Sequence, residues 1–286
     1  MANVHSLGFR YAAGSDAGIV RSRNEDSAFA SPRLFAVADG MGGHPHGDVA
    51  SALVTGVLCE WDERLRVAKP GEVDPPAELA ALVAAALRRL TEFADRDPDL
   101  TSMGSTLTAL LWDGTDAWLA HVGDSRGYLL RDGVLHQITR DHTLVQSLVD
   151  EGRITLEEAA AHPRKSMVMR ALQTGGSAEP DVAPQQVTAG DRLLLCSDGV
   201  TDVVGPDTIR DILGTAATPE DAVRQLTEEA KRSHSPDNIT CVVADAVVGQ
   251  VGGDVLVVGA AADQPELVRR PSPGLLARWT RRLRTG

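Results

Sequence analysis

The sequence is poor in the residues that cross-link a chain or place it in a membrane. Three cysteines occur far apart among 286 residues, without the CxxC or Cys–His spacing of a zinc site, so we expect buried, reduced thiols. No apolar run approaches the roughly eighteen residues of a membrane span, the best candidate being residues 255 to 262. The start, MANVHSLGFR, lacks the basic and apolar regions of a signal peptide, which predicts a cytoplasmic protein.

Nucleotide-binding signatures are also missing. No GxGxxG follows a parallel strand–helix–strand unit, and no GKS or GKT occurs anywhere. The chain has 28 basic and 40 acidic residues, a net charge of -12. An acidic body disfavours nucleic acid as a partner and favours cations.

The composition predicts one large soluble domain followed by a tail. Hydrophobic residues make up 43% and charged residues 24%, as in ordinary globular proteins. After about residue 248 the composition shifts to Gly, Ala, Pro and Arg, so we expect a folded domain over 1–248 and a flexible C-terminal tail over 249–286. The Arg-rich tail could instead form an amphipathic helix on anionic lipid or a phosphoprotein, with one apolar side made of Leu275, Leu276, Trp279 and Leu283.

Apolar spacing predicts an α+β fold. Strands are expected near 9–13, 27–31 and 34–39, and helices over 48–68 and 77–95. Four runs between 105 and 138 are strands joined by connections too short for crossover helices. With the turn signal Asp132-Gly133 between two of them, they must be antiparallel neighbours.

The second half predicts a mobile segment and then a return to regular structure. Residues 143–172 are typical of short helices interrupted by HPRK, and we call them the flap. A strand at 191–197, helices near 207–213 and 219–233, and a closing strand at 238–246 follow. Two groups of strands with paired helices indicate packed sheets with helical outer layers.

Three apolar strands end in a carboxylate. FAVADGMGG places Asp39 after a strand, LLLCSDG does the same for Asp198, and AWLAHVGD for Asp124, while Asp237 comes just before the last strand. Any one Asp-Gly is more often a plain turn. If the ends converge, the carboxylates would repel one another unless a cation neutralised them. Oxygen-only ligands suit Mg²⁺ or Mn²⁺ and disfavour zinc.

With these residues in hand, the sequence resembles the metal-dependent type 2C protein serine/threonine phosphatases, the PPM family, and its bacterial branch in particular. The similarity covers about residues 8 to 247. Its motifs occur in order as GIVR at 18–21 with NED at 24–26, VADGMGG at 37–43, GST at 104–106, HVGDSR at 121–126, TRDH at 139–142, CSDG at 196–199 and PDN at 236–238.

The resemblance implies a β-sandwich of two antiparallel sheets flanked on both sides by pairs of α-helices, a four-layer αββα fold. Residues 1–248 would then be the catalytic domain, with two Mn²⁺ or Mg²⁺ ions at one end of the sandwich. Asp39 would bridge both ions and the Gly40 carbonyl would help to hold one. Asp198 and Asp237 would complete the shell of the other.

The same resemblance implies roles for several further residues. Arg21 would bind the phosphate, and Glu25 and Asp26 would orient waters on the metals. Asp124 would hold a third, weaker ion. The remaining candidates are Ser166 in the flap, Asp202 four residues after Asp198, and Asn238 of the PDN motif.

The implied reaction is attack on phosphorus by a metal-bridging hydroxide, without a covalent enzyme intermediate. Eukaryotic members have a histidine directly after the Asp-Gly that can protonate the leaving group, but Met41 occupies that place here. A metal-bound water is one candidate acid. His44 is the other, and its alternative is a solvated loop histidine.

The leading function is therefore a hydrolase that removes phosphate from Ser or Thr of proteins, opposing bacterial Ser/Thr kinases as a monomer. Two alternatives stay open: a non-catalytic phosphoprotein-binding module, and a phosphatase of an anti-sigma antagonist, which normally carries sensory domains. The metal aspartates Asp39, Asp198 and Asp237 are all present, which favours catalysis.

Overall fold

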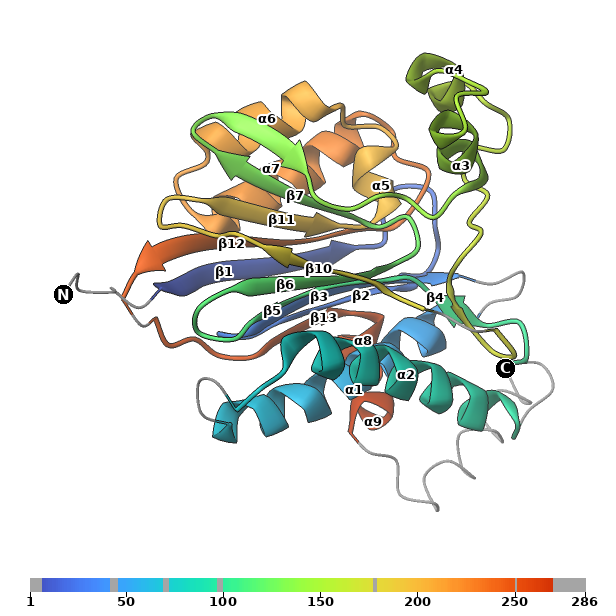
Figure 1. The fold of residues 1–286 in the computed structure, drawn as a ribbon. Helices are drawn as coiled ribbons and strands as arrows, with labels where there is room; N and C mark the ends of the chain where they lie inside the picture. Colours follow the sequence, from blue (N-terminus) through green and yellow to red (C-terminus); the bar gives the residue numbers. More distant parts are fainter. Residues whose placement is uncertain are drawn as a thin grey trace.

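The chain folds into four layers, with two β-sheets face to face and helices on both outer sides (Figure 1). The computed structural model describes residues 7–41, 46–68, 72–96, 100–176, 179–249 and 251–269. Every strand pairing in the two sheets is antiparallel. The predicted αββα sandwich is confirmed.

The first sheet has five strands and is covered by the helices that follow residue 197. Its order is β1 (Leu7–Asp16), β12 (Ile239–Val248), β11 (Arg192–Cys196), β7 (Arg126–Arg131) and β8 (Val134–Gln137). The helices are α5 (Asp198–Thr201), α6 (Pro206–Thr215) and α7 (Pro219–Arg232). Helix α7 starts where the Thr218 side chain accepts a hydrogen bond from the Asp221 amide, and it buries residues at helical spacing against β1 and β12.

The second sheet lies under the two long helices. Its order is β10 (Asp181–Gln185), β6 (Ala117–Val122), β5 (Leu107–Trp112), β3 (Leu34–Met41), β2 (Asp26–Ala30) and β13 (Leu256–Gly259). Two short strands, β4 (Gly104–Ser105) and β9 (Leu172–Gln173), extend it beside the end of β3. Helices α1 (Gly47–Val67) and α2 (Pro75–Ala94) cover its outer face.

Three apolar clusters separate the four layers. One lies between the sheets, where Phe9 contacts Phe35 and Trp112 edge to face at 5.3 and 5.5 Å between ring centroids. The second fills the space between α1, α2 and their sheet, and the third lies under α5 to α7. Because each sheet is covered on both faces, central strands such as β3, β5 and β11 are buried along most of their length, and this explains their nearly continuous apolar sequences.

The flap leaves the sandwich as two short helices, α3 (Leu144–Asp150) and α4 (Leu156–Ala160). Figure 1 shows them standing apart from the sheets, above the end where β11 meets α5. The hairpin predicted at Asp132-Gly133 joins β7 to β8, and both residues have the positive φ that its tight turn requires, 50° and 77°.

The segment after residue 248 is not flexible throughout, contrary to the prediction from the sequence. Strand β13 pairs with β2, and α8 (Ala260–Asp263) and α9 (Pro265–Val268) contact α1. The expected flexible tail is thus folded over 256–268, because its apolar residues complete the edge of the second sheet. The amphipathic stretch around Leu275, Leu276, Trp279 and Leu283 lies outside the described residues.

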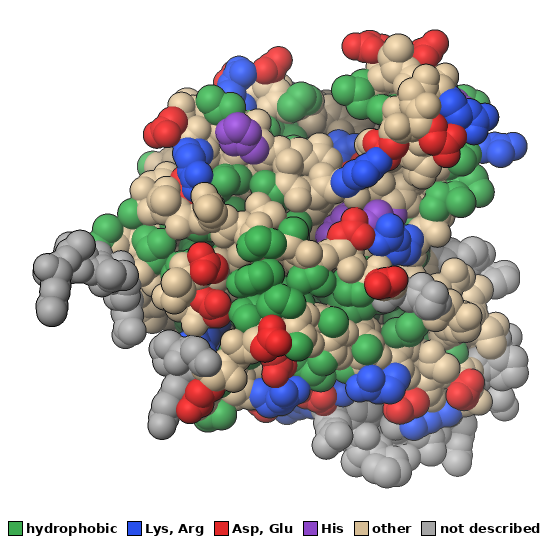
Figure 2. Space-filling view, viewed as in Figure 1, with side chains coloured by type: hydrophobic (Ala, Val, Ile, Leu, Met, Phe, Trp, Pro, Cys, Tyr) green, Lys and Arg blue, Asp and Glu red, His purple; other side chains and the backbone are tan. Residues whose placement is uncertain are grey.

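Other features of the surface and core bear on the predictions. Cys196 and Cys241 are buried free thiols, as expected, while Cys59 is half-buried. Among the described residues, no helix is both long enough and apolar enough to cross a bilayer. On the face in Figure 2, basic and acidic side chains of the described residues are interspersed, so neither sign dominates that face.

Candidate active site

The acidic strand ends converge at one end of the sandwich. In the second sheet, Asp26 of β2 lies directly opposite Asp39 of β3 in the antiparallel register. In the first sheet, Asp198 follows β11 and Asp237 precedes β12, and these two strands are neighbours. Asp39, Asp198 and Asp237 are half-buried, so solvent reaches them, whereas Asp26 and Asp124 are buried.

The electrostatics of these carboxylates show how close they lie. Burial raises the pKa of Asp39 well above its usual range, and the charges of Asp26, Asp198, Asp124 and Asp237 add to that rise. Burial likewise raises the pKa of Asp26 to about 7, of Asp198 to about 6 and of Asp124 to about 8. Like charges this close oppose one another's ionisation, and a bound cation would reverse that effect.

Glycines bring the backbone of the site together. A Cβ on Gly40 would collide with the carbonyl oxygens of Gly47 and Glu25, and the Gly40 amide donates to the Glu25 carbonyl at 3.2 Å. A Cβ on Gly199 would collide with the Asn238 carbonyl oxygen. Only glycine permits Gly40 to lie this close to Glu25 and Gly47, and the same holds for Gly199 beside Asn238.

Hydroxyl groups fix the two central acids. The Asp39 amide donates to Thr106 Oγ1 at 3.0 Å, and the Asp39 carbonyl accepts from the Thr106 amide at 2.8 Å. Ser197 Oγ donates to Asp26 Oδ2 at 2.7 Å. Thr106 and Ser197 were not predicted as site residues, although the GST and CSDG motifs contain them.

The Asn238 side chain joins the PDN turn to neighbouring backbone segments through hydrogen bonds. Its Oδ1 accepts from the Glu25 amide at 2.8 Å, and its Nδ2 donates to the carbonyls of Ala17 and Arg23 at 3.0 and 2.8 Å. The PDN turn is thereby tied to the loop that carries Arg21 and Glu25. Burial raises the pKa of Glu25, and the nearby charge of Asp48 adds to the rise.

Arg21 lies at the rim of the cluster. Its Nη2 donates to Asp237 Oδ2 at 2.7 Å, and its side chain is 49% exposed. A guanidinium carries five N–H donors in a planar fork, so Arg21 retains donors for an anion arriving from solvent. Arg23, two residues further along the chain, enters this network through its carbonyl oxygen.

The flap reaches the cluster through Lys165 rather than Ser166. Lys165 Nζ contacts Asp202 Oδ2 at 2.8 Å, and the charge of Asp202 in turn raises the pKa of Asp198. Ser166 is exposed. The charges of Asp198, Asp141 and Arg126 act on Asp124, which places it near these three residues.

The histidines nearest to the Asp39-Gly40 turn are His44, the candidate acid, and His46. His44 lies outside the described residues. His46 directly precedes α1, and its Nδ1 is buried with no hydrogen-bond partner within the part of the chain that the structure describes.

The donor set fits a hard divalent cation. Carboxylates of Asp39, Asp198 and Asp237, with the Gly40 carbonyl, supply only oxygen, as Mg²⁺ and Mn²⁺ prefer. Within the described residues, no three acidic, His or Cys side chains already stand in ligand geometry. The fit therefore rests on the gathered charge and on the chemistry of the donors.

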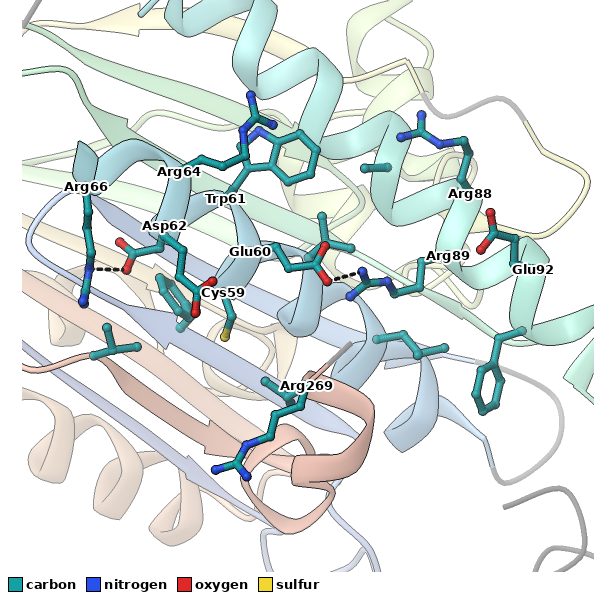
Figure 3. Close-up of a pocket in the computed structure, with 18 of the residues that line it drawn as sticks. Cys59, Glu60, Trp61, Asp62, Arg64, Arg66, Arg88, Arg89, Glu92 and Arg269 are labelled. Atoms are coloured by element: carbon teal, nitrogen blue, oxygen red, sulfur yellow. Dashed lines mark hydrogen bonds and ion pairs between the residues drawn. The ribbon is translucent and has the colours of Figure 1, made fainter. Parts of the chain in front are cut away.

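A cavity lies elsewhere on the molecule. A hollow of about 1040 Å³ is formed by α1, α2 and the C-terminal helix α9, and it is lined by arginines and acids such as the Arg89–Glu60 pair (Figure 3). None of the converging aspartates lines it. Asp39, Asp198 and Asp237 are partly exposed outside this hollow.

Comparisons with known proteins agree with this geometry. The sequence model described as protein phosphatase 2C matches residues 21–231. The serine/threonine protein phosphatase PstP of Mycobacterium tuberculosis is 49% identical over 273 residues, covering 95% of this chain and 52% of that protein. The serine/threonine phosphatase stp of Listeria monocytogenes is 35% identical over 84% of this chain and 97% of its own length. The chain thus spans about half the length of the mycobacterial relative.

Solved structures show the same relation. The crystal structure of the Mycobacterium tuberculosis phosphatase PstP/Ppp superimposes with a TM-score of 0.78 at 51% identity, covering 83% of this chain and 98% of that one. The PstP catalytic domain in complex with two manganese ions gives a TM-score of 0.77 at 50% identity, covering 85% of this chain and 100% of that one. With its fold, motifs and acidic cluster in agreement, this chain belongs to the protein phosphatase 2C family.

Proposed function

We propose that this protein is a metal-dependent phosphatase that hydrolyses phosphoserine and phosphothreonine on proteins. The observation that carries the proposal is the convergence of Asp39, Asp198 and Asp237 beside Arg21 at an open end of the sandwich. A cluster of acids alone would repel a phosphate. Acids that hold cations, with an arginine at their rim, would attract one.

The chain's own residues position the substrate. Arg21, held by Asp237, presents its remaining N–H groups to the phosphoryl oxygens. Asn238 fixes the loop from Ala17 to Glu25, so that Arg21 keeps its place beside the cluster. Thr106 holds the backbone of Asp39 on both sides.

Asp39, Gly40, Asp198 and Asp237 would hold two divalent cations, Mn²⁺ or Mg²⁺, and Asp124 would hold a third. When bound, such ions lower the pKa of a water and offset charge on the phosphoryl group. Glu25 and Asp26 would accept hydrogen bonds from waters in the centre. The related catalytic domain that contains two manganese ions supports Mn²⁺ as the first choice.

The two alternatives are less well supported. A non-catalytic binding module would lack a metal aspartate, yet all three are present and gathered. A phosphatase of an anti-sigma antagonist would perform the same reaction on one particular substrate protein, and no described residue favours that substrate over others. The proposal includes Ser/Thr kinases and their substrates as partners, in the cytoplasm and with the protein as a monomer.

Hydrolysis of p-nitrophenyl phosphate and of a phosphothreonine peptide tests the proposal. We expect turnover with Mn²⁺ or Mg²⁺, none with EDTA, and loss of turnover in Asp39→Asn. The matched control is Asp207→Asn, an exposed acid on α6 whose side chain is paired only on the surface with Arg210. Absence of turnover in folded, Mn²⁺-loaded wild type would contradict the proposal and favour the binding module.

A further inference from the structure

The segment 251–269 lies beyond residue 231, where the match to the family ends, yet it pairs with β2 up to Ser27, the residue next to Asp26. We propose that this segment, here called the brace, is a positioning element that fixes the start of α1 and the junction between Glu25 and Gly40. The inference rests on the proposed function, because it assigns the brace to that site.

The brace docks along the edge of the second sheet. The Tyr11 hydroxyl donates to the Asp254 carbonyl at 2.8 Å where the segment begins. Strand β13 then pairs with β2 from Leu256 opposite Ala30 to Gly259 opposite Ser27. The pairing thus ends one residue from Asp26, a buried acid of the cluster.

Gly259 makes the closest approach. Its φ of 77° lies in the left-handed region, and a Cβ there would collide with the Asp26 carbonyl oxygen and lie 2.8 Å from Ser15 Oγ. A side chain at this position would push β13 away from Asp26, the first residue of β2. The chain needs glycine here both for its conformation and for its contact.

A directed chain of hydrogen bonds leads from the brace into the site. The Ala261 amide donates to Ser27 Oγ at 3.0 Å, and Ser27 Oγ lies 2.9 Å from Ser51 Oγ. Ser51 donates its only hydroxyl hydrogen to the Glu25 carbonyl at 2.6 Å, so Ser27 must donate to Ser51. That carbonyl also accepts from the Gly40 amide. Both serines are fully buried, so no water replaces a lost member.

A second contact holds the first turn of α1. Gln264 Nε2 donates to Asp48 Oδ2 at 3.1 Å, and Asp48 Oδ1 accepts from the Val49 amide at 2.9 Å. The brace therefore holds the side chain of an acid in the first turn of α1.

The far end of the brace is packed against the middle of α1. Leu267 is 1% exposed, and a Cβ on Gly56 of α1 would lie 2.9 Å from the Leu267 carbonyl oxygen. Figure 3 shows Arg89 of α2 pointing toward α1, where its Nη2 pairs with Glu60 at 2.6 Å. Helix α1 is thus held by the brace from its first turn to its middle.

The test compares two glycine substitutions in the full chain. Gly259→Ala forces the brace away from Asp26, whereas Gly252→Ala is the matched control because nothing lies within 4 Å of a Cβ there. Mn²⁺ affinity is measured by calorimetry, and amide hydrogen exchange is followed in the first turns of α1. We expect Gly259→Ala to weaken Mn²⁺ binding by about tenfold or more and to speed exchange there, as the loss of groups that orient metal ligands does. Gly252→Ala should match wild type.

Ser27→Ala is the second variant, since it keeps the brace and removes only the hydroxyl that links it to Ser51. It should weaken Mn²⁺ binding in the same direction, and its thermal midpoint is measured beside the affinity because the buried Ala261 amide loses its acceptor. Variants with lower thermal midpoints but wild-type Mn²⁺ affinity would overturn the inference and leave the brace a purely stabilising element. If wild type binds Mn²⁺ but does not hydrolyse phosphoesters, the proposed function fails, while affinity and exchange still decide the role of the brace.

Discussion

At the acidic end of the sandwich, two glycines matter because they have no side chain. Gly40 and Gly199 allow backbone segments to cross where any side chain would collide with a carbonyl oxygen. Hydrogen bonds from neutral side chains hold the neighbouring residues: Thr106 accepts from the Asp39 amide, Ser197 donates to Asp26, and Asn238 accepts from the Glu25 amide. Asp39 and Asp26 are held in place by neutral groups, which leaves their charge available to a cation.

Gly40→Ala should destabilise the protein by about 2 kcal/mol, because the new methyl group overpacks two backbone carbonyls. Gly214→Ala in α6 meets open space and should stabilise by about 0.5 kcal/mol, as Ala favours a helix over Gly. Urea unfolding measures both free energies. Equal stabilities for the two variants would contradict the close approach of Gly40 to Gly47.

His121 should make stability depend on pH. Its ring is 1% exposed between Thr108 Oγ1 and the Arg140 carbonyl, and burial lowers its pKa to about 4, with the charge of His142 adding to the effect. Because the folded pKa lies below the unfolded value of 6.5, the neutral ring's full contribution is present above about pH 6.5 and is lost as pH falls toward 4.

Over that range wild type should lose about 3 kcal/mol of unfolding free energy relative to His121→Gln, which does not titrate there. Urea unfolding of both proteins at pH 7, 5.5 and 4.5 gives the comparison. Parallel pH profiles would show that His121 is not responsible.

At the level of elements, apolar spacing was enough for the long strands and helices. The strands β1 to β3, the antiparallel group from β5 to β8, and helices α1 and α2 lie where the sequence predicts them, because each buries a continuous apolar face. The positions of Asp39, Asp198 and Asp237 followed from the strand ends. Their meeting in space needed the family resemblance, since register between distant strands is not encoded locally.

The elements missed from the sequence are short or lie at sheet edges. Strand β10 contains Pro184 and few apolar residues, and it forms because β6 offers an open edge where a proline is tolerated. Strand β13 follows a Gly-rich stretch and depends on β2 in the same way. Such segments have little structure of their own and take it from their neighbours.

An ion pair joins the flap to Asp202 at the end of α5, and its loss should change hydrogen exchange in the flap alone. Lys165 and Asp202 are 41% and 34% exposed, and exposed pairs contribute at most about 1 kcal/mol. Lys165→Gln should therefore leave global stability nearly unchanged while amide exchange in α3 and α4 speeds up.

Arg153→Gln is the control for the flap, because Arg153 pairs with Glu151 within the flap itself. Hydrogen exchange by mass spectrometry reports both variants. Unchanged exchange in Lys165→Gln would mean that this ion pair does not hold the flap.

At the scale of the whole molecule, two sheets joined face to face bring carboxylates from distant parts of the chain to one end. In the absence of cations that end is electrostatically unfavourable, as the raised pKa values of Asp26, Asp39 and Asp198 show. Binding of cations should then couple to folding, because the unfolded chain separates the acids.

Mn²⁺ should raise the thermal midpoint of wild type. At a Mn²⁺ concentration a hundred times the dissociation constant, the free energy of unfolding should rise by about 2.7 kcal/mol. Without metal, Asp39→Asn should be at least as stable as wild type, since it removes one of the repelling charges, but Mn²⁺ should stabilise it far less. Differential scanning fluorimetry across Mn²⁺ concentrations tests both. Equal Mn²⁺ stabilisation of the two proteins would exclude Asp39 from the metal centre.

The most direct measurement is anomalous diffraction from crystals of the protein grown with Mn²⁺. We expect two strong peaks between the sheets' acidic ends, both contacting Asp39, with Asp198 and Asp237 on one of them. Peaks located only elsewhere on the molecule, with the cluster of Asp39, Asp198 and Asp237 free of metal, would contradict the assignment of this site.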